Sequence, residues 1–165
     1  MAWWSRSRAL ILVLVWSAIL LSRPGNGAAQ QPRRCGAGDL AALRGFSAGL
    51  DAAVDGWPIA NASDDGCCDW PGVLCDEAPG GSAAVVGLVL PNRTLRGEVA
   101  ASLAGLAALR VLNLSSNALR GAIPVALLRL RSLEVLDVSA NALAGGLGPA
   151  AVIKLPALRV FNVSG

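Results

Sequence analysis

The sequence predicts an α/β solenoid, a stack of short strand-and-turn repeats, closed at its N-terminal end by a helical cap. Three observations predict it. One pattern recurs every 24 residues in the second half of the 165-residue chain, an amphipathic segment precedes the repeats, and three of the four cysteines fall between residues 67 and 75.

The chain opens with a stretch typical of a secretory signal peptide. Residues 1–8 carry two arginines and no acid, residues 9–21 are apolar except for Ser17, and Gly27 and Ala29 satisfy the small-residue rule for cleavage. A membrane anchor is the alternative, but thirteen residues extend only about 20 Å, less than the ~30 Å hydrocarbon core. We therefore expect a signal peptide at 1–29 and a mature chain that is secreted or extracellular, without a membrane span.

Removal of this leader would change the charge of the chain. The whole sequence has 14 basic and 11 acidic residues, a net charge of +3. Three of the arginines lie in the leader, so the mature chain is neutral. A neutral chain gives no charge argument for binding nucleic acid or an anionic membrane surface.

The segment after the leader predicts a short amphipathic helix. Its apolar residues recur at spacings of three, three and four: Leu40, Leu43, Phe46 and Leu50. Asp39 would cap or complement the helix N-terminus, and Gly49 lies near its end. A polar loop follows. Trp57 in this loop, and Trp70 beyond it, are expected to seal an edge of the core rather than to stack on a ligand.

In a secreted chain the four cysteines are most simply two disulfides: Cys35, Cys67, Cys68 and Cys75. Zinc is the alternative, but the spacing contains no CxxC, the chain has no histidine, and adjacent thiolates are awkward ligands for one tetrahedral ion. A bond between the two adjacent cysteines would be strained. Of the two remaining connectivities, Cys35–Cys67 with Cys68–Cys75 is favoured because it closes one long and one hairpin-sized loop. The crossed pairing stays open from spacing alone.

Three copies of one pattern follow, and a fourth begins at residue 160. They read GLVLPNRTLRG, VLNLSSNALRG, VLDVSANALAG and VFNVSG, and their first large apolar residues are spaced by 24, 24 and 25: Leu88, Leu112, Leu136 and Phe161. An extra Gly148 accounts for the longer spacing. This period, with alternating apolar residues and an Asn five places on, is the leucine-rich-repeat signature. The sequence thus predicts a cap over 30–84 and leucine-rich repeats over 85–165, three complete and a fourth truncated.

Each position of the repeat has a physical role. Alternation along the strand would send Leu112 and Leu114 inward, so that stacked strands form a parallel sheet over a ladder of leucines. Asn117 and Asn141 would point inward at the turn, where their amides bond backbone groups. The first copy has Arg93 at that position. A guanidinium has no acceptor, so this turn must be satisfied differently or be partly open.

These features resemble the N-terminal cap and first repeats of plant leucine-rich-repeat receptor proteins. The motifs that carry the resemblance are CGAGDLAALRGF, CCDWPGVLC and LRGAIP, and VVGLVLPNRTLRGEV, RVLNLSSNALRGAIP and LPALRVFNVSG are similar to the start of phytosulfokine-receptor-type receptor kinases. The resemblance covers essentially the whole mature chain. It implies Cys35–Cys67 and Cys68–Cys75 disulfides, a glycosylated ectodomain, and binding of a peptide or co-receptor. Such receptors also carry many more repeats, a membrane helix and a kinase, which these residues do not include, and no ligand-contact residue carries over.

The sequence offers no catalytic, metal or cofactor site. It has no histidine, no glycine-rich phosphate loop and no nucleophile elbow, and its acids are scattered rather than paired. Asp64, Asp65, Asp69 and Asp76 match no EF-hand spacing, which favours a solvated acidic loop. Four Asn-x-Ser/Thr sequons predict a glycoprotein: Asn61, Asn92, Asn113 and Asn162.

The candidate binding surface is the concave side of the solenoid, formed by outward strand positions: Val89, Val111, Asn113, Val135, Asp137 and Asn162. It is polar beside a shallow apolar stripe, without an aromatic hot spot. Glycans at two of these asparagines would compete with a ligand there. We expect a non-enzymatic, receptor-type interaction module that binds a peptide hormone or acts as a co-receptor or decoy. The alternatives are a secreted protein resembling polygalacturonase inhibitors and a truncated receptor-kinase fragment without a function of its own.

Overall fold

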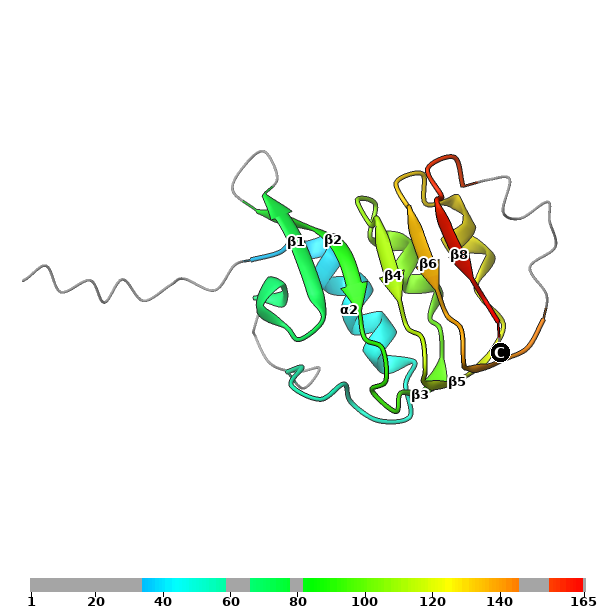
Figure 1. Cartoon of the computed structure of the whole chain (residues 1–165). Coiled ribbons are helices and arrows are strands. Elements are labelled where there is room, and N and C mark those ends of the chain that lie inside the picture. The colour runs from blue at the N-terminus through cyan, green and yellow to red at the C-terminus, as the bar shows by residue number, and fades with distance from the viewer. Residues whose placement is uncertain (1–33, 59–65, 78–81, 146–154, 165) are drawn as a thin grey trace, which may run out of the picture. The chain divides into compact units, whose positions relative to one another are not determined.

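The computed structural model describes residues 34–58, 66–77, 82–145 and 155–164, all within one compact unit, Pro32–Gly165 (Figure 1). The predicted signal peptide, the sequon at Asn61, the acids Asp64 and Asp65, and Gly148 lie outside the described residues. Within the described ranges, no helix has the length and apolar character needed to cross a bilayer.

A five-stranded sheet runs along the repeats in the order β1-β2-β4-β6-β8 (Figure 1). The strands are β1 (Val73–Glu77), β2 (Ala83–Val89), β4 (Val111–Asn113), β6 (Val135–Asp137) and β8 (Val160–Asn162). From β2 onward they are parallel, and the register pairs the first large apolar residue of every copy: Leu88, Leu112, Leu136 and Phe161. This register confirms the predicted leucine-rich-repeat stacking.

Two features of the strands were not predicted. The cap contributes its own strand, because β1 pairs antiparallel with β2 and extends the repeat sheet. The residues that follow the turn of each repeat form one strand of a second, parallel sheet of three strands, in the order β3-β5-β7. Its strands are β3 (Arg96–Glu98), β5 (Ala118–Gly121) and β7 (Ala142–Leu143).

The predicted cap helix is α2 (Ala37–Ala48), and short 3₁₀ helices complete the cap and the repeats: η1 (Cys67–Asp69), η2 (Ala101–Gly105) and η3 (Val125–Arg129). The side chain of Asp39 lies in the first turn of α2 but makes no side-chain cap. Its carboxylate instead accepts the Val85 backbone N–H at 2.8 Å. Asp39, expected to cap or complement the helix N-terminus, thus does not cap it; it is an acid in the first turn, and it also fastens the helix to β2.

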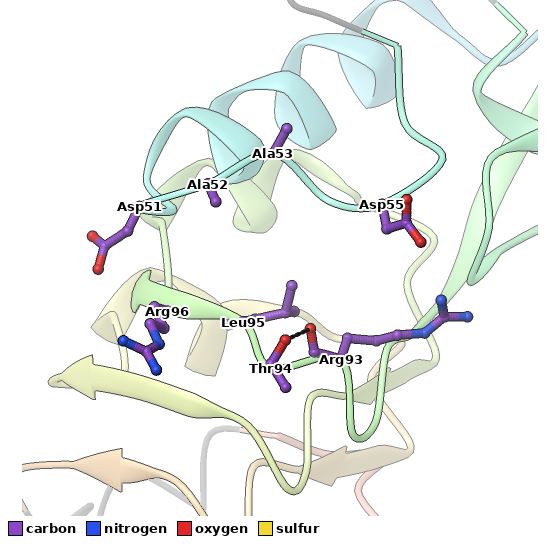
Figure 2. Close-up of a pocket in the computed structure, with 8 residues that line it drawn as sticks. All are labelled: Asp51, Ala52, Ala53, Asp55, Arg93, Thr94, Leu95 and Arg96. Carbon is purple, nitrogen blue, oxygen red and sulfur yellow. Dashed lines mark hydrogen bonds between the residues drawn. The ribbon is translucent and has the colours of Figure 1, made fainter.

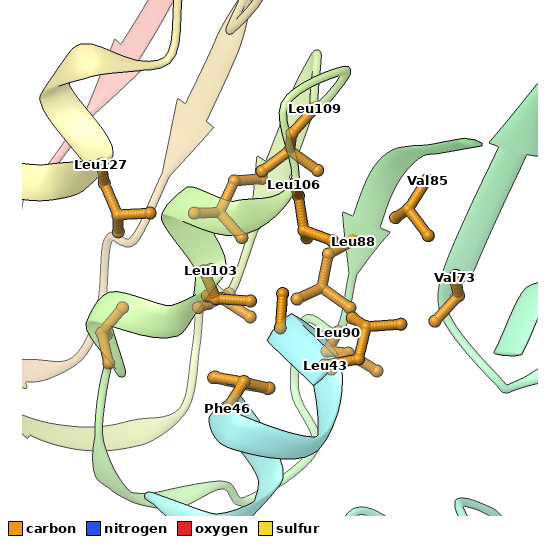
Figure 3. Close-up of a cluster of buried hydrophobic side chains, with 14 of the residues drawn as sticks. Leu43, Phe46, Val73, Val85, Leu88, Leu90, Leu103, Leu106, Leu109 and Leu127 are labelled. Carbon is orange, nitrogen blue, oxygen red and sulfur yellow. The ribbon is translucent and has the colours of Figure 1, made fainter. Parts of the chain in front are cut away.

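The core is continuous from the cap into the repeats. Leu43 and Phe46 of α2 are fully buried together with the leucines of the strands and turns, as Figure 3 shows. Each fully buried leucine or phenylalanine stabilises the fold by about 1.5–3 kcal/mol. The cap therefore completes the hydrophobic ladder at its N-terminal end. Phe161 of β8 is only partly buried against the core.

Candidate functional site

Two disulfides hold the cap. The structure joins Cys35 to Cys67, with Cα atoms 5.7 Å apart, and Cys68 to Cys75, with Cα atoms 5.6 Å apart. The first links the segment just before α2 to η1, and the second links η1 to β1. The two adjacent cysteines thus fasten the helix and the extra strand to one short turn.

The two tryptophans of the cap pack against each other at the edge of the hydrophobic core. Trp57 and Trp70 are both buried, with ring centroids 5.0 Å apart, and the Trp57 ring also meets Phe46 edge-on at 6.2 Å. The Trp57 indole N–H donates to the Pro71 carbonyl at 2.9 Å, whereas the buried Trp70 indole N–H has no hydrogen-bond partner among the described residues. Both rings pack within the cap as the sequence predicts, so neither is displayed as a ligand platform.

The turn asparagines bond the backbone of two repeats at once. The Asn117 amide N–H groups donate to the carbonyls of Leu90, Leu114 and Ser115 at 2.8–3.1 Å. Its Oδ1 accepts the backbone N–H groups of Arg93 and Leu95 at 2.9 and 3.0 Å. Asn141 repeats most of this pattern one turn later.

This arrangement explains how the first turn is satisfied without an asparagine of its own. The Asn117 side chain of the second repeat accepts backbone N–H groups of the first turn, which contains Arg93. The arginine side chain is therefore not needed to satisfy that turn. The Arg93 residue is exposed. A pocket of about 290 Å³ lies beside it, lined by parts of the loop from Asp51 to Asp55 and by the turn from Arg93 to Arg96 (Figure 2). Of the two expected outcomes, the structure shows the first, because Asn117 of the next repeat satisfies this turn.

The outward side of the five-stranded sheet, here called the sheet face, is the predicted concave surface. One line across it is apolar, and the strand register gives its members: Leu74, Gly87, Val111, Val135 and Val160. We call this line the apolar row. The two residues at its ends are about half exposed, Leu74 at 50% and Val160 at 48%. A Cβ on Gly87 would lie 2.9 Å from the Leu74 side chain, so the cap leucine occupies the space that a side chain at residue 87 would need.

A second line begins at Val89 and continues with three polar side chains that a recurring turn fixes: Asn113, Asp137 and Asn162. We call this line the polar row. The Asn113 Oδ1 accepts both the backbone N–H and the hydroxyl of Ser115, at 3.0 and 2.8 Å. Asp137 makes the same pair of bonds with Ser139, and Asn162 makes them with Ser164. Within the described residues, the second polar atom of each of these three side chains makes no hydrogen bond, so the row presents the Asn113 Nδ2, the Asp137 Oδ2 and the Asn162 Nδ2 in order.

Ion pairs flank the apolar row on its other side. Asp76 of β1 lies 3.5 Å from Arg110, and Glu134 lies 3.6 Å from Arg159. Sequence reasoning missed both pairs and the contribution of Leu74. A repeat alignment would have revealed that residues 110, 134 and 159 share one column, but nothing in the local pattern places Leu74 and Asp76 beside the repeats.

The four sequons fall in different settings. Asn92 is exposed, in the left-handed region at φ 53°. Asn113 and Asn162 belong to the polar row, and Asn61 lies outside the described residues. In the part of the chain that the structure describes, no group of three or more His, Cys, Asp or Glu side chains is arranged to hold a metal ion.

Comparison with known proteins finds family models that match both the cap and the repeats. Residues 37–76 match the leucine rich repeat N-terminal domain, and residues 88–143 match the leucine rich repeat. The chain carries a capped leucine-rich-repeat fold of the plant receptor ectodomain type. It is 36% identical to phytosulfokine receptor 1 of Arabidopsis thaliana over 106 residues, which are 64% of this chain and 10% of the receptor. The match thus spans about a tenth of the length of that receptor.

Solved structures of Arabidopsis thaliana proteins share the fold. A chain of the BIR3–SERK2 complex superposes with a TM-score of 0.66 at 29% identity, covering 76% of this chain and 67% of that one. The HAESA receptor kinase ectodomain, solved with an IDA peptide hormone ligand, superposes with a TM-score of 0.62 at 28% identity, covering 77% and 20% respectively. The leucine-rich-repeat fold and its cap therefore rest on both sequence and structure.

Proposed function

We propose that this leucine-rich-repeat module binds an extended peptide or protein segment on its sheet face. The observation that carries the proposal is the apolar row, which crosses neighbouring strands between a line of ion pairs and a line of fixed polar side chains. Apolar side chains at its centre would bury a ligand's apolar groups, and the flanking polar groups would fix its orientation. Solenoid surfaces of this kind are extended rather than pocket-like, and a segment of chain fits that shape.

The relatives support a binding role in perception or co-reception. HAESA was solved with a peptide hormone, and BIR3 was solved in complex with SERK2. Because this chain matches only a tenth of phytosulfokine receptor 1, we carry over the class of partner, a peptide or another ectodomain, and no particular ligand. We further propose that the module acts outside the cell, as its receptor-type fold and apolar leader favour.

A selection experiment tests the sheet face. A displayed library of random peptides is enriched on the secreted wild-type chain, and the enriched peptides are then measured on Val135→Arg and Val125→Arg. Val135 lies in the middle of the apolar row, whereas Val125, at 64% exposure, lies on η3 and outside the sheet. Enriched peptides should lose binding to Val135→Arg and keep it on Val125→Arg. Equal binding to both variants, or no enrichment, would remove the proposal.

We also propose that Asn92 carries a glycan. It is exposed, and within the described residues its side chain makes no hydrogen bond. It also lies outside the apolar and polar rows, so a glycan there leaves the sheet face open. Glycans at Asn113 or Asn162 would instead stand on the polar row itself.

A further inference from the structure

The pocket between the cap loop and the first repeat turn is a second candidate site. None of its lining residues belongs to the sheet face. Its volume of about 290 Å³ lies at the small end of the range for organic ligands. A ligand of this pocket must therefore be small.

The walls of the pocket are fixed by backbone hydrogen bonds. The Asp51 N–H donates to the Arg96 carbonyl at 2.9 Å, and the Glu98 N–H donates to the Gly49 carbonyl at 3.1 Å. The Asn117 side chain of the next repeat also holds the turn, because it accepts the backbone N–H groups of residues 93 and 95. The loop and the turn are thus tied together at one end, and the space between them does not depend on a ligand.

Charged side chains stand at both ends of the pocket (Figure 2). At one end, both carboxylate oxygens of Asp51 accept hydrogen bonds from Arg120, at 2.8 and 3.0 Å. Arg96 lies beside Asp51 at the same end. At the other end, Asp55 and Arg93 make no side-chain ion pair or hydrogen bond with the residues that the structure describes. Ala52, Ala53 and Leu95 lie between the two ends. The available chemistry is therefore the free carboxylate of Asp55 and the free guanidinium of Arg93 at one end, the Arg96 guanidinium beside Asp51 at the other, and an apolar floor between them.

We propose that this pocket binds a small zwitterion, a free α-amino acid with an aliphatic side chain. Its carboxylate would pair with the Arg93 guanidinium, whose planar donors match a carboxylate in bidentate fashion. Its ammonium would donate to the Asp55 carboxylate. Its side chain would cover Ala52, Ala53 and Leu95, which removes apolar surface from water.

Binding of L-leucine tests the proposal, because two analogues each remove one of its charges. Radiolabelled leucine is added to the full chain secreted from a eukaryotic host and measured by equilibrium dialysis, with isocaproate and isoamylamine as competitors. Isocaproate lacks the ammonium, and isoamylamine lacks the carboxylate. Leucine should bind saturably, and each analogue should compete about tenfold less well, the effect of losing one charge-assisted hydrogen bond.

Variants locate the binding. Arg93→Asn introduces the residue that the later repeats use at this position, and Asp55→Asn removes only the charge. Each should weaken leucine binding by about tenfold or more, whereas Arg131→Asn, an exposed arginine outside the pocket, should bind as wild type does. Unchanged thermal unfolding of each variant shows that the fold persists. Absence of saturable binding to the folded wild type, or binding unaffected by both pocket variants, overturns the proposal.

Discussion

Asp51 and Arg120 lie 69 positions apart in the sequence and form a two-point ion pair, with Nη1–Oδ2 and Nη2–Oδ1 distances of 2.8 and 3.0 Å. Asp51 belongs to the loop after the cap helix, and Arg120 belongs to β5 of the second repeat. The pair therefore spans the first repeat and ties the cap directly to the second. Both side chains are exposed at the surface, so the pair orders the loop more than it stabilises the core.

This pair gives the cap loop a defined pH dependence. The hydrogen bond from Arg120 lowers the pKa of Asp51 below its ordinary value of 3.8, and the same bond raises the pKa of Arg120. A lowered carboxyl pKa in the fold gives stability that is present above the unfolded value and lost as pH falls through the folded value. Wild type should therefore unfold at a higher temperature than Asp51→Asn at neutral pH, and the difference should close below pH 3.8.

Scanning calorimetry across this pH range measures the difference. Asp76→Asn is the matched control, because Asp76 meets Arg110 through a single contact of 3.5 Å, and its effect at neutral pH should be smaller. A difference between wild type and Asp51→Asn that persists unchanged at low pH would show that the ion pair is not its origin.

Asn117 should be the most sensitive polar residue of the described repeats. Replacement with alanine removes the hydrogen-bond partner of the Leu90 carbonyl and of the Arg93 and Leu95 backbone N–H groups, whereas the Leu114 carbonyl keeps its bond from the Asn141 amide. Unsatisfied part-buried groups cost about 1–3 kcal/mol each, so Asn117→Ala should lower the free energy of unfolding by roughly 2–4 kcal/mol. Urea unfolding measures the loss.

The aspartate variant separates the two halves of this amide. Asn117→Asp keeps an acceptor for the N–H groups of Arg93 and Leu95 but brings an oxygen against the three carbonyls that the amide N–H groups now serve. It should destabilise at least as much as alanine. An aspartate variant as stable as wild type would mean that the donor bonds contribute little.

Gly97 should tolerate no side chain. Its φ is 117°, and an added Cβ would lie 2.5 Å from the Gly49 carbonyl oxygen and 2.7 Å from the Leu50 Cα. Both atoms are backbone, so neither can turn away as a flexible side chain would. Gly97→Ala should lower the free energy of unfolding by about 2 kcal/mol or more, through strain at the cap–repeat junction.

Gly38 is the control for this substitution. It lies in α2, and a Cβ there would meet nothing within 4 Å. Gly38→Ala should instead raise the free energy of unfolding by about 0.5–1 kcal/mol, because alanine is the better helix former. Similar losses in the two variants, measured by urea unfolding, would contradict the close approach at Gly97.

Glycosylation should be detectable at Asn92. The chain secreted from a eukaryotic host should show a glycan on the peptide that contains this residue, and Asn92→Gln should lower the intact mass by that one glycan. Because Asn92 lies outside the apolar and polar rows, peptide binding by the sheet face should not change. An unmodified Asn92 in secreted protein would contradict the proposal, and Thr94→Ala, which removes the sequon but keeps the asparagine, provides the control.

The repeats could be predicted because their information is local and repeated. The positions of Leu88, Leu112 and Leu136 follow from the 24-residue period, and their register in the sheet confirms it. The inward asparagines follow in the same way, since each repeat needs the same backbone partners. The leucine positions and the inward asparagines are therefore properties of a single repeat that recur in the next one.

The rest depends on contacts between segments that share no pattern. Leu74 joins the apolar row only because β1 pairs antiparallel with β2, and Asp39 serves Val85 rather than its own helix end. The pocket arises where the cap loop meets a turn whose asparagine is missing. The sequence shows that Arg93 departs from the asparagine of the later repeats. The loop that faces it lies 38 residues or more away along the chain, and tertiary packing alone places that loop beside the turn.

The two disulfides should contribute unequally to stability. They join cysteines 32 and 7 positions apart, and a cross-link stabilises by removing freedom from the unfolded chain, more so for the longer loop. The double variant Cys35→Ser, Cys67→Ser should therefore lose roughly 1 kcal/mol more than Cys68→Ser, Cys75→Ser in the free energy of unfolding, by the loop-length dependence alone. Non-reducing peptide mapping of wild type should first show both linkages and no free thiol. Equal losses would mean that burial of Cys67 and Cys68 outweighs loop length, and a crossed linkage in the map would contradict the structure of the cap.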